Sequence, residues 1–113
     1  MSQLNTQETS ETKLIFPVTN TMLFLSPAKI IRLEAKSNYT KIFFDDRKPV
    51  TTCRVLKQYE TILKPLGFVR THRSHLVNKN RVASIHQNNI YMDDDSIAEI
   101  SRRKKTEVMK QLQ

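Results

Sequence analysis

Apolar residues in this chain come in short runs, and this spacing strongly limits what the chain can fold into. Each run holds only a few residues and is followed by polar or turn-forming ones. Short runs rich in β-branched and aromatic residues are typical of strands. We expect strands at residues 13–16, 21–25, 31–36, 40–44, 49–53, 68–71, 81–85, 89–92 and 97–100. Many short strands with one or two small helices predict a mainly β domain.

Several details of this strand pattern are themselves predictions. Residues 31–36 alternate apolar and charged side chains, so one face of that strand should be buried and the other wet. Pro17 should end the first strand, and the acidic triplet at 93–95 should form a solvated hairpin tip. Residues 73–80 are expected to form a loop with short turns.

One segment changes to a helical period. The apolar residues between positions 54 and 63 form a single stripe: Val55, Leu56, Tyr59, Ile62 and Leu63. We expect a helix over 54–63, capped by Thr52 and ended by Pro65 and Gly67. Gly67 is the only glycine in the chain, so it should adopt a positive φ. A second, basic helix is expected over 102–113.

The net charge of +8 is unevenly distributed. Residues 29–81 hold 13 basic and only four acidic residues, and a second basic cluster occupies 102–105. Such patches attract phosphate, either in nucleic acid or on a membrane surface. Four cations at the start of a helix oppose its dipole, and a bound phosphate would relieve that conflict. A solvated basic tail is the alternative interpretation.

The soft metal donors and the catalytic motifs are sparse. His72 and His75 stand three apart, but only His86 and Cys53 remain as further soft donors, so we expect no metal site and no cofactor. A nucleophile elbow, a glycine-rich phosphate loop and a zinc motif are all missing, so we do not expect an enzyme. Cys53 is the only cysteine, which excludes an internal disulfide, and we expect it to be a small buried hydrophobe.

The chain ends and hydropathy suggest where the protein acts. Residues 1–12 offer almost nothing apolar to bury and are expected to be a disordered leader, which leaves 13–113 as one domain. The chain shows no signal-peptide pattern and no apolar run of even half membrane-spanning length. We therefore expect a cytoplasmic protein that does not insert into a membrane.

Three sequence blocks, in order, resemble the LytTR family of DNA-binding domains. They are the strand at 31–35 with Asn38-Tyr39-Thr40, the segment 68–78, and the closing segment 98–103. The resemblance covers about residues 13–110. It implies short antiparallel strands in several small sheets, a β-β-β sandwich, with loops that enter successive major grooves on one face of DNA.

The resemblance also implies a context for the domain. Family members usually follow a phosphoacceptor receiver domain, as in bacterial two-component systems. This chain has no room for a receiver, so we expect either a free-standing member or a fragment of a longer regulator.

The resemblance assigns the DNA-binding residues. The candidates lie in three loops: Asn38, Tyr39, Thr40 and Lys41; Arg70, His72, Arg73 and Ser74; and Arg102, Arg103 and Lys105. Thr40, Arg73 and Arg102 match positions that contact bases in some relatives. Some of those relatives have histidine at the position of Thr40 and asparagine at the position of Arg73. The neighbouring polar and basic residues would contact phosphates. Because arginine pairs best with guanine, we expect a base preference different from that of those relatives.

The resulting hypothesis is a sequence-specific regulator of transcription that binds double-stranded DNA, with two copies on direct-repeat sites. The alternative is a basic protein-interaction module that modulates another regulator or polymerase, since the same charge pattern permits it. A membrane-surface role ranks third, because the helix at 102–113 has only Val108, Met109 and Leu112 as apolar anchors.

Overall fold

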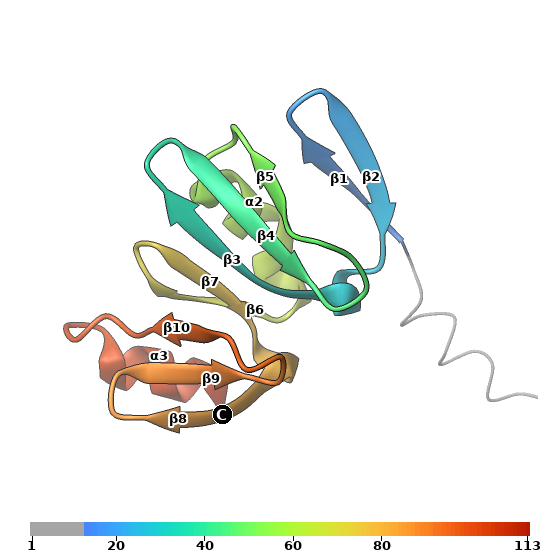
Figure 1. The fold of residues 1–113 in the computed structure, drawn as a ribbon. Helices are drawn as coiled ribbons and strands as arrows, with labels where there is room; N and C mark the ends of the chain where they lie inside the picture. Colours follow the sequence, from blue (N-terminus) through green and yellow to red (C-terminus); the bar gives the residue numbers. More distant parts are fainter. Residues whose placement is uncertain (1–12) are drawn as a thin grey trace, which may run out of the picture.

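The structure is a computed structural model and describes residues 13–113, so the expected leader lies outside the described residues (Figure 1). The strands are β1 (Leu14–Val18), β2 (Thr21–Leu25), β3 (Ile30–Lys36), β4 (Tyr39–Phe44), β5 (Val50–Thr52), β6 (Phe68–His72), β7 (His75–Asn78), β8 (Val82–His86), β9 (Asn89–Met92) and β10 (Ile97–Glu99). The helices are α2 (Leu56–Leu63) and α3 (Lys105–Leu112), with short 3-10 turns at Pro27–Lys29, Lys64–Leu66 and Lys79–Arg81. The expected mainly β fold is confirmed.

The strands form three small antiparallel sheets that lie one after another (Figure 1). A β1–β2 hairpin comes first, a five-stranded sheet in the order β5-β4-β3-β7-β6 lies in the middle, and a three-stranded sheet in the order β10-β9-β8 comes last. Helix α2 packs against β3, β6 and β7, and α3 packs against β6. The central sheet therefore has neighbours on both faces.

Two hydrophobic cores cover the two faces of the central sheet. Neighbouring residues on one strand point to different cores, as Phe68 and Val69 do on β6. The first core joins the β1–β2 hairpin and α2 to the sheet, through residues that include Phe16, Leu25, Leu33, Ile42, Tyr59, Leu63 and Leu76. The second joins the three-stranded sheet and α3, through Ile31, Val69, Val77, Ile90, Met92, Ala98, Ile100 and Val108.

The prediction of one wet face for residues 31–36 is wrong at Arg32. This side chain is only 6% exposed, because the three-stranded sheet covers the face on which it lies. Its Nε donates to Ser96 Oγ at 2.9 Å and its Nη1 to Glu34 Oε1 at 3.2 Å. The guanidinium carbon also lies 4.0 Å from the centroid of the Phe43 ring. The charge is thus accommodated by partners rather than by water.

Two strand boundaries also differ from the prediction. Pro17 lies within β1, where it pairs with Met22, and does not end the strand. Proline has no backbone N–H to donate. Because β1 pairs with another strand on one side only, proline can lie in this strand without breaking hydrogen bonds to a second neighbour. Strand β7 occupies part of the segment expected to be a loop, and all four of its residues are buried. It pairs with both β3 and β6.

Both helices begin a few residues later than predicted, and α2 ends at Leu63 as expected. Helix α2 begins at Leu56 with Val55 as N-cap, and Thr52 Oγ1 instead accepts from the Arg54 amide at 3.0 Å. Gly67 has the expected positive φ, at 97°. Helix α3 begins at Lys105, not at residue 102, so Arg102 and Arg103 precede the helix, whereas Lys104 at the N-cap and Lys105 in the first turn still oppose the helix dipole.

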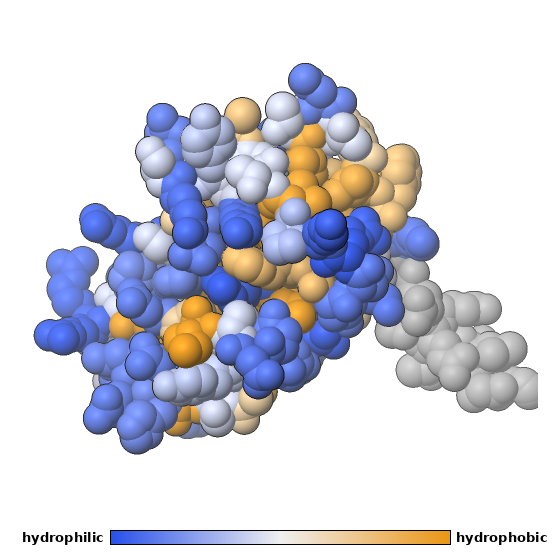
Figure 2. Space-filling model, viewed as in Figure 1, coloured by the Kyte–Doolittle hydropathy of each residue, from blue (hydrophilic) through white to orange (hydrophobic). Residues whose placement is uncertain are grey.

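Cys53 is exposed, contrary to the prediction of a buried thiol. It follows the last residue of β5, Thr52, which takes the inward-facing position. The outer face of the β1–β2 hairpin is the other notable exposed surface. It leaves Ile15, Met22 and Phe24 more than half exposed, and this region is strongly apolar in Figure 2.

Tyr59 ties the first core together and supplies a stability test. Its buried ring stacks on Phe16 at 4.7 Å, and its hydroxyl donates to the Pro17 carbonyl at 2.7 Å and lies 2.9 Å from Thr52 Oγ1. We expect Tyr59→Phe to lower the free energy of unfolding by about 1–2 kcal/mol, because buried acceptors lose their donor. Urea denaturation measures this. The matched Tyr39→Phe, at a half-exposed ring, should change little, and equal stabilities of both variants would contradict the assignment.

Candidate nucleic-acid interface

Three loops lie together at one end of the central sheet. The turns β3–β4 and β6–β7 are adjacent there, because Glu34 pairs with His75 and the Ala35 amide donates to the Ser74 carbonyl at 2.9 Å. The β10–α3 loop joins them through the Ser101 amide, which donates to the Thr71 carbonyl at 2.7 Å. All three loops follow one side of the molecule, on the left in Figure 1. We call this side the loop edge.

The loop edge is rich in exposed polar and basic side chains. The β3–β4 turn exposes Lys36, Ser37, Asn38 and Tyr39; the β6–β7 turn exposes Arg73; and the β10–α3 loop exposes Arg102, Arg103 and Lys104. Most of this side is hydrophilic in Figure 2. Both arginines expected to read bases, Arg73 and Arg102, are therefore accessible to a ligand.

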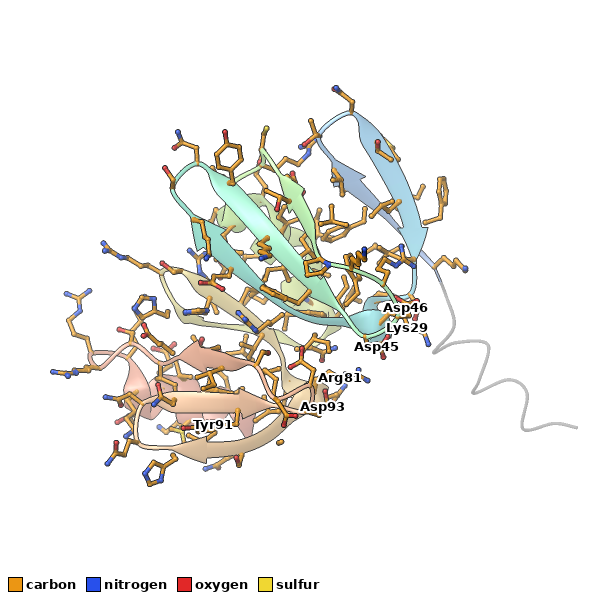
Figure 3. All side chains as sticks on the ribbon, viewed as in Figure 1. Lys29, Asp45, Asp46, Arg81, Tyr91 and Asp93 are labelled. Carbon is orange, nitrogen blue, oxygen red and sulfur yellow. The ribbon has the colours of Figure 1, made fainter. Side chains whose placement is uncertain are left out.

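The aspartates lie at the opposite end of the sheets. Asp45 and Asp46 follow β4, Asp93 follows β9 in the expected hairpin tip, and Figure 3 shows these three away from the loop edge. Arg81 holds two of them, with Nη2 at 2.7 Å from Asp45 Oδ2 and Nε at 3.3 Å from Asp93 Oδ2. A hydrogen bond from Arg47 lowers the pKa of Asp46 below its usual value. Arg81, Arg47 and neighbouring lysines balance these aspartates, so the excess of positive charge lies at the loop edge.

Arg70, expected to contact DNA, is engaged within the protein. Its Nε donates to the His72 carbonyl at 3.0 Å and its Nη2 to the Arg73 carbonyl at 2.6 Å. Its Nη1 pairs with Glu60 Oε1 at 2.7 Å, which anchors the guanidinium to helix α2. Arg70 therefore clamps the backbone of the β6–β7 turn and sets where Arg73 is presented.

The assignment of Thr40 to base contact is wrong for this structure. Thr40 is fully buried, and its hydroxyl donates to the Arg54 carbonyl at 2.7 Å. Because strand residues alternate in direction, the inward Thr40 leaves Tyr39 outside. Lys41 is half-buried, with its Nζ 5.4 Å from the centroid of the Phe43 ring. Asn38 and Tyr39 are the exposed candidates of the first loop.

The β6–β7 turn carries two histidines beside a glutamate of β10. His72 Nδ1 accepts from the Ser74 amide at 3.0 Å, and His72 Nε2 lies 3.7 Å from Glu99 Oε1. His75 is buried on β7, and burial lowers the pKa of its imidazole, which favours the neutral ring. Ser74 is half-buried, so its backbone rather than its hydroxyl shapes the turn.

A hollow of about 500 Å³ extends the basic surface from the loop edge towards α2 and α3. Glu60 and Glu107 also line it, but cations predominate: Lys57, Lys64, Arg70, Arg73, Arg103 and Lys104. Lys57, Lys64 and Lys104 were not among the DNA-binding candidates, although Lys104 belongs to the basic cluster at 102–105. A signal for the first two was present, since Lys57 and Lys64 lie seven positions apart on the polar side of the helical stripe. Lys105, the first residue of α3, is half-buried.

Exposed basic loops on a rigid β scaffold define a domain that binds a polyanion such as nucleic acid. The comparisons with known proteins agree. The family model for the LytTr DNA-binding domain matches residues 20–113, so the chain belongs to this family of DNA-binding domains. Within residues 13–113, no helix is long and apolar enough to span a membrane.

The fold is shared with a solved relative. It is similar to the LytTr DNA-binding domain of a Bacillus cereus protein described as a methyl-accepting/DNA response regulator. The TM-score is 0.73 at 23% sequence identity, over 90% of this chain and 97% of that chain. This likeness confirms the expected arrangement of small antiparallel sheets. The search of curated proteins finds no match.

The clamp by Arg70 can be tested with a variant that keeps its charge. Lysine cannot reproduce the fork of donors that holds two carbonyls and a carboxylate. We therefore expect Arg70→Lys to lower the free energy of unfolding by about 1–2 kcal/mol and to weaken DNA binding. Chemical denaturation and fluorescence anisotropy measure the two effects. Glu60→Gln should reproduce part of the loss, whereas unchanged stability in Arg70→Lys would contradict the clamp.

Proposed function

We propose that this chain is a sequence-specific regulator of transcription that binds double-stranded DNA and reads major-groove bases from its loop edge. The observation that carries the proposal is the excess of exposed cations without partners at one end of the central sheet. Three loops with exposed basic side chains lie at this end, whereas Arg81 and Arg47 pair with the aspartates at the other end. Such a distribution orients the loop edge towards DNA during approach.

Arg73 and Arg102 suit the role of base readers. Both are exposed, and neither guanidinium makes a hydrogen bond or ion pair within residues 13–113. A free guanidinium on a positioned loop can donate two parallel bonds to guanine O6 and N7. Asn38 lies in the neighbouring turn, and its side-chain amide can form two parallel bonds with adenine N6 and N7.

The other cations suit the phosphate backbone. Arg103 and Lys104 flank Arg102, and Lys57 and Lys64 extend the basic surface along α2. Such contacts release counterions and supply affinity without sequence information. Two copies on direct repeats would each present one loop edge to the same face of the DNA. The role is one of binding rather than catalysis, and a basic protein-interaction module is the competing hypothesis.

The division between base and phosphate contacts predicts different behaviour of two variants. We expect Arg102→Ala to weaken binding to the preferred duplex by about 1–3 kcal/mol and to flatten the preference at one base position. Lys104→Ala should instead weaken matched and scrambled duplexes alike and reduce the salt slope by about one. Lys48→Ala removes the same charge from the exposed β4–β5 connection, far from the loop edge, and serves as the matched control.

The preferred duplex would be selected from a random pool, and anisotropy at two salt concentrations would measure affinity for it and for a scrambled duplex. An enriched motif that binds more tightly than the scramble at both salts supports the proposal. No enriched motif, with affinities that fall together as salt rises, would overturn base reading and favour the protein-interaction module.

A further inference from the structure

Three metal-ligating side chains meet where the second and third loops join. They are His72 at the end of β6, His75 at the start of β7 and Glu99 at the end of β10. One ring nitrogen from each histidine and one carboxylate oxygen all lie within 4.8 Å of one another. The imidazole rings are 5.5 Å apart between centroids. Histidines and cysteines alone do not reveal this group in the sequence, because its third member is Glu99.

His75 is a buried polar side chain without a partner. It is 7% exposed, and its Nδ1 finds no hydrogen-bond partner within residues 13–113. A buried ring nitrogen that makes no hydrogen bond raises the free energy of the folded protein, and a bound ligand would remove this cost.

We propose that His72, His75 and Glu99 form a binding site for a divalent first-row transition metal ion of the zinc type. Two imidazoles and one carboxylate are a donor set that zinc accepts, with a fourth position left for water or another ligand. Two of these side chains, His72 and Glu99, also line a hollow of about 430 Å³ together with Asn88, Asn89 and Arg102.

The cluster can contract to metal-binding distances. Donor atoms in a tetrahedral zinc site lie about 3.3 Å apart, given bond lengths near 2.0–2.1 Å. His75 is fixed by burial, but the side chains of His72 and Glu99 are 27% and 61% exposed and have room to move towards it. The bound ion would link the β6–β7 turn directly to β10.

The charges around the cluster bear on its affinity. Glu34 and Glu99 favour a cation near His75, whereas Arg32 opposes it. Arg32 is already paired with Glu34 at 3.2 Å, which reduces its repulsion. Glu34 and Glu99 therefore both attract the ion, and of the two only Glu99 belongs to the ligand cluster.

Metal binding would change one hydrogen bond of the turn. His72 Nδ1 accepts from the Ser74 amide, so the proton of the neutral ring is on Nε2. Coordination through Nε2 requires this nitrogen to give up its proton and Nδ1 to carry one, and the Ser74 amide then loses its acceptor. The amide of Ser74 is thus a local reporter of metal binding.

The test is a calorimetric titration of the chelator-treated full chain with Zn²⁺ alone. We expect one saturable site per chain, with a Kd on the order of micromolar. Glu99→Gln, at an exposed position that should not disturb folding, should raise the Kd at least about tenfold. His75→Phe should do the same, and His86→Gln, at an exposed histidine outside the cluster, should leave the Kd unchanged.

The Ser74 amide resonance gives a second measurement, since it should shift on addition of Zn²⁺ in the parent chain but not in Glu99→Gln. Absence of saturable binding would overturn the proposal. So would a Kd in Glu99→Gln equal to that of the parent chain, because binding would then occur elsewhere. DNA binding is not part of this readout, so the metal site stands or falls independently of the proposed function.

Discussion

Burial of the central sheet on both faces is the constraint on which the rest of the structure depends. The buried apolar residues on β3, β6 and β7 belong to one of two cores, and strand pairing fixes where the turns between these strands begin and end. The loops themselves contribute little to these cores. They can therefore carry exposed arginines and lysines, because the packed strands behind them supply the stability and the geometry. The same two-sided burial forces Arg32 and Thr40 to find partners within the protein.

Paired and unpaired charged side chains lie at different ends of this scaffold. Carboxylates at one end of the domain are held by Arg81 and Arg47, so they stabilise hairpin tips and stay away from the loop edge. Cations at the other end are mostly unpaired and exposed. Paired charges thus serve the fold, and unpaired charges are left for the partner. The exception is Arg70, a cation at the loop edge that acts as a structural clamp.

Local patterns in the sequence predicted the features that depend on neighbouring residues. The apolar stripe predicted α2, the single glycine predicted the positive φ at 67, and the acidic triplet predicted a hairpin tip. Features that depend on distant residues could not be derived in this way. The sequence did not predict strand β7, because His75 and Asn78 interrupt its apolar pattern. Asn78 can be buried because its amide donates to the Ile30 carbonyl at 2.9 Å. The meeting of Glu99 with the histidines likewise arises from the contact between β6 and β10.

Arg70 holds the backbone of the β6–β7 turn in a way that does not depend on which side chain occupies position 73. Two of its three bonds go to main-chain carbonyls, which every amino acid possesses, and none goes to the side chain of Arg73. The side chain at position 73 can therefore be exchanged while the turn keeps its shape. Under the proposed role of Arg73 in base reading, a single substitution at this position would change the DNA target of the domain without refolding its scaffold.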